Sequence, residues 1–242
     1  MTSFVTTEQR RSELYLDCRF IEETGQRLLG LPRVTVATAI ALFHNFNAKS
    51  AVRKHDRLDV SMACLLLAGK IEESPMELDL IINKCLELRI SSPDPESDCA
   101  RLRERVVRLE LDILDAIDFE VNIDHPYKYA VDCIRAMAEK QLIEYSKPPK
   151  TIGDGDEKIV QNTRMVKDLV KQAVRFAHDS MYSSLCVSHS AQEVAMSCVY
   201  LACKCLDIRP IGGKTWTELL EIPTEVLAAV SFTYQNWSIS KK

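Results

Sequence analysis

The stretch that decides the fold runs from Asp59 to Lys70 and reads DVSMACLLLAGK. If this segment is a helix, it is apolar nearly all round, and a helix of that kind is enclosed by other helices. A second copy lies 134 residues further on, where Glu193 to Lys204 reads EVAMSCVYLACK. Six of the twelve positions are identical in register. The sequence therefore predicts two copies of one helical unit, each with a buried central helix.

The repeat extends into the segment that precedes each central helix. The same offset, without a gap, places Ala39 on Ala173 and His44 on His178. A histidine that is duplicated by repeat symmetry is most simply a structural residue, bonded inside its own unit. We therefore expect His44 and His178 to have structural roles, and not to bind metal or transfer protons.

Helical spacing and long apolar runs predict ten helices, five in each unit, and strand alternation is nearly absent. The expected fold class is all-α, with two tandem five-helix domains. Asp124-His125-Pro126 divides the chain, so the expected domains are residues 1–123 and 124–242. A segment rich in Pro, Gly and Asp, residues 146–156, is expected to form a mobile excursion. The predicted helices span residues 10–29, 33–47, 57–72, 76–89, 101–118, 126–143, 162–183, 190–206, 214–221 and 224–237.

The composition narrows the classes of function. The 242 residues are 46% hydrophobic and 27% charged, which is enough apolar material for two packed units. The 31 basic residues are outnumbered by 35 acidic ones, so the excess of positive charge that a phosphate backbone requires is missing. No stretch approaches the ~18 uncharged apolar residues of a membrane span. We expect a soluble intracellular protein with no direct nucleic-acid partner and no membrane partner.

The sequence contains no catalytic or metal-binding motif. Kinase, esterase and zinc-protease signatures are all missing from it. Most of the nine cysteines, such as Cys64 and Cys198, have apolar neighbours and are expected to be reduced core residues. Cys203 and Cys205 form a pair, but no second pair follows at zinc-ligand spacing. We therefore predict no enzymatic activity, no cofactor and no metal.

Gly213-Lys214-Thr215 is similar to the end of a phosphate-binding loop. The first glycine of such a loop would fall at Ile208, and no strand is predicted before it. We interpret the segment as a loop followed by the start of a helix.

Several further motifs accompany the central helix of the first unit, which ends in Leu-Ala-Gly-Lys-Ile-Glu-Glu. Together they resemble the paired cyclin boxes of the cyclin family, over nearly the whole chain. Asp124-His125-Pro126-Tyr127 resembles the transcriptional cyclins K, T, L and Q. The likeness looks nearest to cyclin K in His125-Pro126-Tyr127-Lys128-Tyr129, Asp179-Ser180 and Ser184-Leu185-Cys186. The motifs are Phe43-His44-Asn45-Phe46, Leu109-Glu110, Asp118-Phe119 and Asp124-His125-Pro126-Tyr127.

The resemblance implies a kinase-binding site in the first unit. Lys70 and Glu110 stand where cyclins place the lysine and glutamate that grip the kinase, and Glu73 stands where transcriptional cyclins add an acidic contact. A lysine can donate to carbonyl groups of a partner, and a carboxylate can accept from its N–H groups. The alternative is that Lys70 and Glu110 pair only with each other. Lys204 repeats Lys70, but Cys205-Leu206-Asp207 replaces the paired glutamates, so the second unit is expected to be the supporting one.

The implied function is that of a regulatory subunit in the nucleus. Such a cyclin forms a heterodimer with a transcriptional cyclin-dependent kinase and activates it toward the C-terminal domain of RNA polymerase II. The kinase carries out the chemistry, and the cyclin selects its active arrangement. The alternative is a cyclin-fold general transcription factor or scaffold that activates no kinase. The sequence leaves open which kinase is bound and which transcriptional subtype this is.

Overall fold

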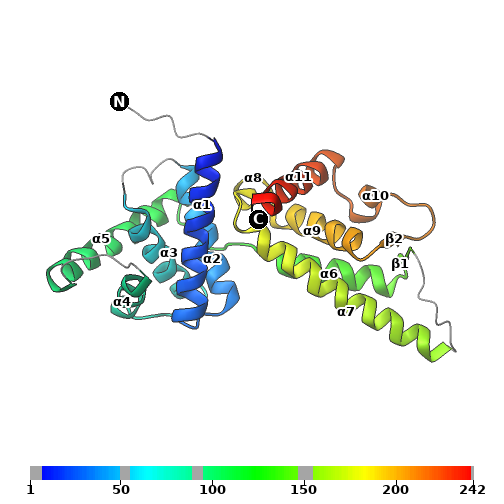
Figure 1. Ribbon diagram of the computed structural model, residues 1–242, viewed down its shortest axis with the longest axis horizontal. Coiled ribbons are helices and arrows are strands. Elements are labelled where there is room, and N and C mark those ends of the chain that lie inside the picture. The colour runs from blue at the N-terminus through cyan, green and yellow to red at the C-terminus, as the bar shows by residue number, and fades with distance from the viewer. Residues whose placement is uncertain (1–6, 50–54, 89–94, 147–154, 241–242) are drawn as a thin grey trace. The chain divides into compact units, whose positions relative to one another are not determined.

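The computed structural model describes residues 7–49, 55–88, 95–146 and 155–240. Within these residues the chain is mainly helical, with one pair of three-residue strands (Figure 1). The predicted all-α class is confirmed. No helix in the described part has the length and the apolar character that crossing a membrane demands. Contacts divide the chain into two compact units, residues 1–123 with 181–187 and residues 124–180 with 188–242.

Five α-helices occur in the described part of residues 1–123, and their order follows the prediction. The segment predicted as one helix over 10–29 is an α-helix that continues into a π-helix, named η1. The segment predicted to begin at residue 101 begins at Pro95, because proline suits the first position of a helix. The elements are α1 (Thr7–Glu22), η1 (Glu23–Leu28), α2 (Arg33–Ala48), α3 (Arg57–Ile71), α4 (Leu78–Leu88) and α5 (Pro95–Ala116).

Helix α3 is the centre of this unit, as its apolar sequence predicts. It contacts α1, α2, α4 and α5, and the residues from Asp59 to Gly69 are buried. The Asp56 side chain accepts a hydrogen bond from the backbone N–H of Leu58 over 2.8 Å and so caps the first turn. At the same end, Arg105 Nε of α5 donates to the buried Asp59 Oδ2 over 2.7 Å. These contacts fix where α3 begins and hold it against α5.

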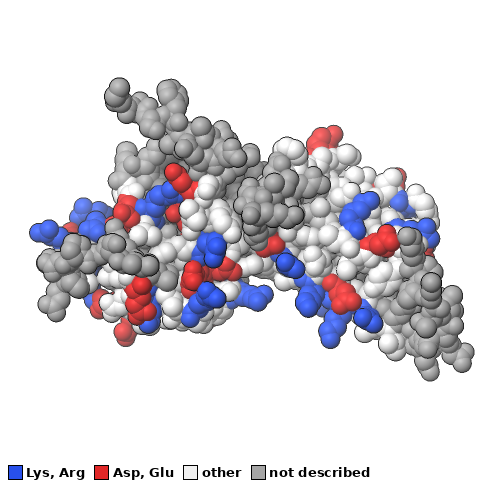
Figure 2. Space-filling view, in the orientation of Figure 1, with Lys and Arg blue, Asp and Glu red and all other residues white. Residues whose placement is uncertain are grey.

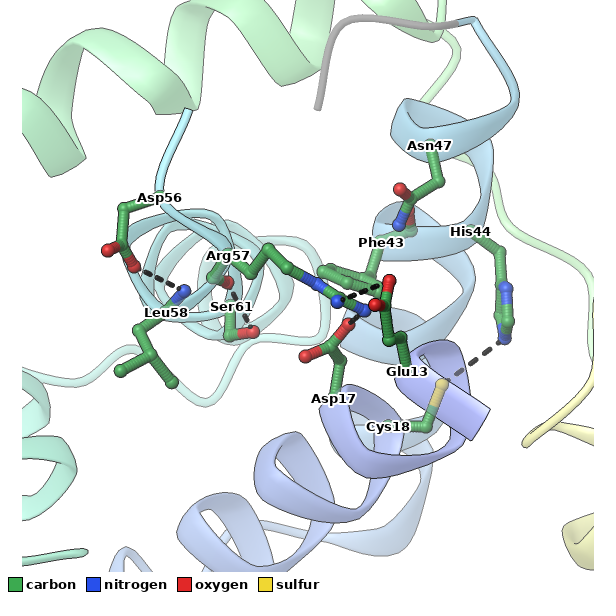
Figure 3. A network of polar contacts seen from close by, with 10 residues as sticks. All are labelled: Glu13, Asp17, Cys18, Phe43, His44, Asn47, Asp56, Arg57, Leu58 and Ser61. Carbon is green, nitrogen blue, oxygen red and sulfur yellow. Dashed lines mark hydrogen bonds and ion pairs between the residues drawn. The ribbon is translucent and has the colours of Figure 1, made fainter. Parts of the chain in front are cut away.

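A polar network joins α1 to the start of α3 (Figure 3). Arg57 of α3 forms ion pairs with Glu13 and Asp17 of α1. Asp17 is largely buried, and this burial raises the pKa of its carboxyl group to about 6, although the nearby Arg57 acts in the opposite direction. The folded chain therefore holds a proton on Asp17 that the unfolded chain releases between pH 3.8 and about 6. In that window the contribution of Asp17 to stability falls as the pH rises.

His44 lies beside this network and binds a segment that is distant in sequence. Its Nε2 is 2.9 Å from the carbonyl oxygen of Met181 and 3.4 Å from Cys18 Sγ. Next to Met181, the Tyr182 hydroxyl donates to the carboxylate of Glu22, and its ring lies 5.5 Å from that of Tyr15. Residues 181–187 therefore belong to the first unit, whereas the expected boundary places them in the second.

Replacing His44 by glutamine is expected to make the protein less sensitive to acid. Burial lowers the pKa of His44 from 6.5, although its hydrogen bond to Met181 acts in the opposite direction. Below pH 6.5 the unfolded chain therefore binds more protons, and wild-type stability falls as the pH falls. As the pH falls from 6.5 to 5.5, the unfolding free energy of the wild type should therefore decrease more than that of the variant. Urea unfolding across this range measures the difference.

Comparing the wild type with His44→Gln isolates the contribution of His44, because Asp17 is present in both proteins. Below pH 6 the contribution of Asp17 to stability rises as the pH falls, which opposes the effect of His44. His178→Gln, at the corresponding position of the repeat, controls for the exchange of a histidine. Equal pH dependence of the wild type and His44→Gln would contradict the prediction.

The second unit repeats this plan around α9, which contacts α6, α7 and α11. A capping box closes the first turn of α9. The Ser190 side chain accepts from the backbone N–H of Glu193, and the Glu193 side chain accepts from the backbone N–H of Ser190. In the same unit the Tyr127 hydroxyl lies 3.4 Å from His178 Nδ1. Both repeated histidines thus make structural contacts, as expected. Most of helix α8 (Leu185–Ser188) belongs to the segment 181–187 of the first unit. The elements of the second unit are α6 (Pro126–Glu139), β1 (Ile143–Tyr145), α7 (Gly155–Ser180), α9 (Ala191–Cys205), β2 (Ile208–Pro210), α10 (Trp216–Leu220) and α11 (Thr224–Ser240).

Helix α8 was not among the ten predicted helices, because four residues are too few to show helical spacing. Two details of the second unit also bear on the prediction. The antiparallel pair of β1 and β2, with Ile143 opposite Pro210, was not expected, since three residues are too few to show alternation. Thr215 caps α10 by accepting from the N–H of Glu218, and Gly212 and Gly213 adopt positive φ. The interpretation of this segment as a loop and helix start is confirmed. Most of the predicted excursion, residues 147–154, lies outside the described residues.

The cysteines are free thiols, and most of them are at least partly buried. Burial raises the pKa of Cys85 and Cys198 to about 12, which keeps both thiols protonated and unreactive at neutral pH. Cys205 is exposed at the end of α9 and so departs from the expected core position. The fully buried cysteines are Cys18, Cys64, Cys85, Cys198 and Cys203.

Candidate functional site

The candidate site begins where the chain turns back at the end of α3. The backbone N–H of Ser74 donates to the carbonyl oxygen of Gly69 over 2.8 Å. A Cβ atom on Gly69 would lie 2.9 Å from the backbone oxygen of Ser74, so only glycine allows this close approach. Glu73, in the turn, adopts a left-handed φ of 52°. This reversal places Lys70 and Glu73 at the exposed end of an otherwise buried helix.

The structure brings Lys70 of α3 and Glu110 of α5 together. Lys70 Nζ lies 2.5 Å from Glu110 Oε1. The Lys70 side chain is 51% exposed and that of Glu110 is 12% exposed. An ammonium group has three N–H donors, and one contact with Glu110 leaves the others available to a partner. The sequence left open that Lys70 and Glu110 pair with each other, and in the free chain they do. This ion pair is compatible with the binding of a partner protein.

The two glutamates that follow Lys70 differ in their surroundings. Glu72 accepts a hydrogen bond from the Thr38 hydroxyl of α2 over 2.6 Å, and this bond holds it against its own unit. Glu73 is exposed, and its side chain has neither a hydrogen bond nor an ion pair within the described residues. Of the two, Glu73 is the carboxylate available to a partner.

Sequence reasoning missed the individual apolar residues of this surface. Val107 and Leu111, on either side of Glu110 along α5, are 46% and 61% exposed. Phe119 and Val121, just after α5, are 63% and 41% exposed. Several exposed apolar side chains within a short stretch of sequence are typical of a protein-binding surface.

An unusual backbone turn presents Phe119. Asp118 and Phe119 both adopt left-handed φ angles, 54° and 58°, which cost energy for residues other than glycine. The Phe119 N–H donates to the Leu114 carbonyl over 2.9 Å, and Lys49 Nζ lies 2.7 Å from Asp118 Oδ2. These two contacts hold the strained turn in place. The sequence signal was the Asp118-Phe119 motif, but its residue types could not reveal the exposure.

We call this set the α3–α5 surface and define it by Lys70, Glu73, Glu110, Leu111 and Phe119. Exposed aromatic and aliphatic anchors beside a few charged groups are the usual composition of a protein–protein interface. The described residues contain no cluster of three or more side chains able to hold a metal ion. The arrangement is suited to binding another protein.

The corresponding end of α9 in the second unit is different. Lys204, which repeats Lys70, lies with its Nζ 5.6 Å from the centre of the Tyr200 ring. It forms no ion pair among the residues described, and Asp207 rather than a pair of glutamates follows it. The features of the α3–α5 surface are therefore not duplicated.

The comparison with known families decides the affiliation of the chain. Residues 6–122, which include the α3–α5 surface, match the family described as cyclin, N-terminal domain. These residues form a cyclin N-terminal domain. The cyclin resemblance of the first central helix is thereby confirmed, and the α3–α5 surface lies on a cyclin domain.

Curated cyclins of types T and L resemble this chain over most of its length. Cyclin-T1-5 of Arabidopsis thaliana is 28% identical over 91% of this chain and 36% of its own length. Cyclin-L1 of Homo sapiens is 28% identical over 94% of this chain and 41% of its own length. This cyclin thus spans about two fifths of the relatives that it matches. The resemblance to transcriptional cyclins is confirmed for types T and L, and the nearer likeness to cyclin K stays a prediction.

Solved structures share the cyclin fold. A chain of the yeast RNA Pol II CTD kinase CTDK-1 complex has a TM-score of 0.70 with 17% identity, covering 97% of this cyclin and 67% of that chain. A chain of the yeast TFIIK (Kin28/Ccl1/Tfb3) complex has a TM-score of 0.57 with 18% identity, covering 95% and 86%. At these identities the likeness establishes the fold.

Proposed function

We propose that this cyclin binds and activates a cyclin-dependent kinase of the transcriptional class, which phosphorylates the C-terminal domain of RNA polymerase II. The cyclin is the regulatory subunit of a heterodimer in the nucleus, and its first unit, residues 1–123, is the kinase-binding half. The proposal follows the similarity to cyclins T and L and to a chain of a CTD kinase complex. The observation that carries it is the α3–α5 surface, within the cyclin N-terminal domain.

The contacts of this surface suit the task of orienting a kinase. Lys70 can donate to carbonyl oxygens at the end of a partner helix, and Glu110 and Glu73 can accept from backbone N–H groups. Phe119 and Leu111 supply apolar anchors that lose water on binding. Because a kinase alone samples inactive arrangements, a rigid surface that binds only the active one shifts the population toward it.

Reconstitution of kinase activity tests the proposal. The full chain is added to purified catalytic subunits of transcriptional cyclin-dependent kinases, and phosphate transfer to a recombinant RNA polymerase II C-terminal domain is measured. At least one kinase should form a stable complex and phosphorylate its substrate at least about tenfold faster, since a cyclin shifts an equilibrium that lies toward the inactive state. Complexes that form without any gain in activity would favour the scaffold alternative. Failure to bind any of these kinases would contradict the proposal.

A further inference from the structure

Four basic side chains follow one another along α7 of the second unit. Arg164, Lys167, Lys171 and Arg175 occur at intervals of three, four and four residues, which places them on one face of an α-helix. All four are exposed. Lys and Arg side chains gather over α7 in Figure 2. We call these four residues the α7 basic stripe.

The opposite face of α7 fixes the stripe in position. Met165, Leu169 and Ala173 are buried, with exposures of 4%, 0% and 0%. They lie on the side of the helix that packs against α6 and α9. The stripe is therefore held by the core of its unit and keeps its spacing when it binds a ligand.

The positive charges of the stripe are weakly compensated. Arg164 Nε lies 3.9 Å from Asp168 Oδ2, and these side chains are 83% and 47% exposed. In the part of the chain that the structure describes, Lys167, Lys171 and Arg175 form no ion pair. Like charges three or four residues apart on a helix repel one another. An anion bound along the stripe would relieve this repulsion.

We propose that the α7 basic stripe binds a doubly phosphorylated segment of a partner protein, with the two phosphates three residues apart. A helix rises ~1.5 Å per residue, so the centre of the Arg164–Lys167 pair lies about 11 Å from that of the Lys171–Arg175 pair. In an extended peptide, three residues span about 10 Å. Each pair thus receives one phosphate, and the arginine of each pair can bind it through two parallel hydrogen bonds.

The charge balance favours a phosphopeptide over a nucleic acid. A phosphate monoester carries about −1.5 to −2 charges at neutral pH, so two of them match four cations. Duplex DNA carries one charge per ~1.7 Å of its axis and would extend well beyond a stripe of about 16 Å. The surface beyond the stripe is mixed in sign, as Figure 2 shows, and the chain has a net charge of −4. This inference goes beyond the proposed function and needs no bound kinase.

Fluorescence anisotropy with the full chain alone tests the proposal. The probe is a short labelled peptide with two phosphoserines three residues apart, compared with the same peptide without phosphate. The phosphopeptide should bind at least about tenfold more tightly, with an affinity that falls as salt is raised from about 50 to 200 mM. Equal binding of the two peptides would overturn the proposal. Tighter binding of a single-stranded RNA with the same number of charges would also overturn it.

Variants locate the binding on α7. Lys167→Glu with Lys171→Glu should weaken phosphopeptide binding at least about tenfold, since two attractive contacts become repulsive. The control, Arg19→Glu with Arg33→Glu, gives the same change in net charge on exposed residues of the first unit and should leave binding unchanged. Equal effects of the two double variants would contradict the assignment. Thermal unfolding of both establishes that they remain folded.

A milder variant tests the same site without charge reversal. Asp168 is the acidic residue beside Arg164, so Asp168→Asn removes a negative charge from the edge of the stripe. The variant should bind the phosphopeptide at least about twofold more tightly, because Arg164 loses its competing partner. Unchanged or weaker binding would count against the proposal.

Discussion

Combined replacement of Lys70 and Glu110 by alanine is expected to lower kinase binding about 100-fold or more. The two residues meet where α3 and α5 join, and each can form charge-assisted hydrogen bonds with a partner backbone. The loss of two central polar contacts typically costs about 3 kcal/mol or more, and each 1.4 kcal/mol is a factor of ten. Binding is measured by surface plasmon resonance with the purified kinase, and activation by the phosphorylation rate.

The double variant is preferable to either single one. Removing Lys70 alone would leave the 12%-exposed Glu110 carboxylate without its ion-pair partner, whereas removing both avoids an uncompensated charge. Glu144→Ala with Arg209→Ala is the matched control, because it removes another partly exposed ion pair, at 2.8 Å, from the second unit. The free energy of unfolding of each double variant should lie within about 1 kcal/mol of the wild-type value. Normal kinase activation by a folded Lys70→Ala, Glu110→Ala variant would show that the site is wrongly assigned.

Replacing Phe119 by alanine is expected to weaken kinase binding by about ten- to 100-fold with little effect on stability. The side chain is 63% exposed, so its removal leaves no large cavity in the free protein. In a complex, a buried aromatic anchor commonly contributes 2 kcal/mol or more. The hydrogen bond from the N–H of residue 119 to the Leu114 carbonyl involves only the backbone. The alanine variant therefore keeps this bond, and the turn stays closed. Isothermal titration calorimetry with the purified kinase measures the change.

The second unit supplies a closely matched control for this variant. Phe232 on α11 is 64% exposed, and Phe232→Ala removes the same side chain from an equally accessible position. Kinase affinity should stay within about twofold of the wild type, because the proposed contact surface lies on the first unit. If the two phenylalanine variants lose the same affinity, the strained turn at Asp118 and Phe119 has no special role in binding.

The repeat predicts the central helices well because their apolar sequences leave little choice of surroundings. The segments predicted over 57–72 and 190–206 are helices over Arg57–Ile71 and Ala191–Cys205. The helix starts predicted at residues 101 and 162 were less accurate. Pro95 and Gly155 resemble breakers, yet each begins a helix, since the first turn needs no intrahelical N–H donors. Helix interiors are set by periodicity, and helix ends are set by local contacts that a sequence pattern does not contain.

The candidate site could be predicted only in part. The Lys70 and Glu110 positions follow from motifs, but their approach to 2.5 Å depends on how α3 packs against α5. The exposure of Phe119 depends on two left-handed residues that residue preferences disfavour. The α7 basic stripe is visible in the sequence at helical spacing, but it was obscured by a net negative charge, since the total charge does not show how charges are distributed over faces.

The bond from His44 to Met181 has a consequence for synthesis. On the ribosome, residues 1–123 emerge first, yet the Met181 carbonyl group that accepts the hydrogen bond from His44 is made 137 residues after the histidine. Until then the imidazole lacks this acceptor, and residues 1–123 lack the contacts that residues 181–187 make with them. The nascent first unit is therefore less stable than the finished one, and its assembly is complete only after about half of the second unit has been translated.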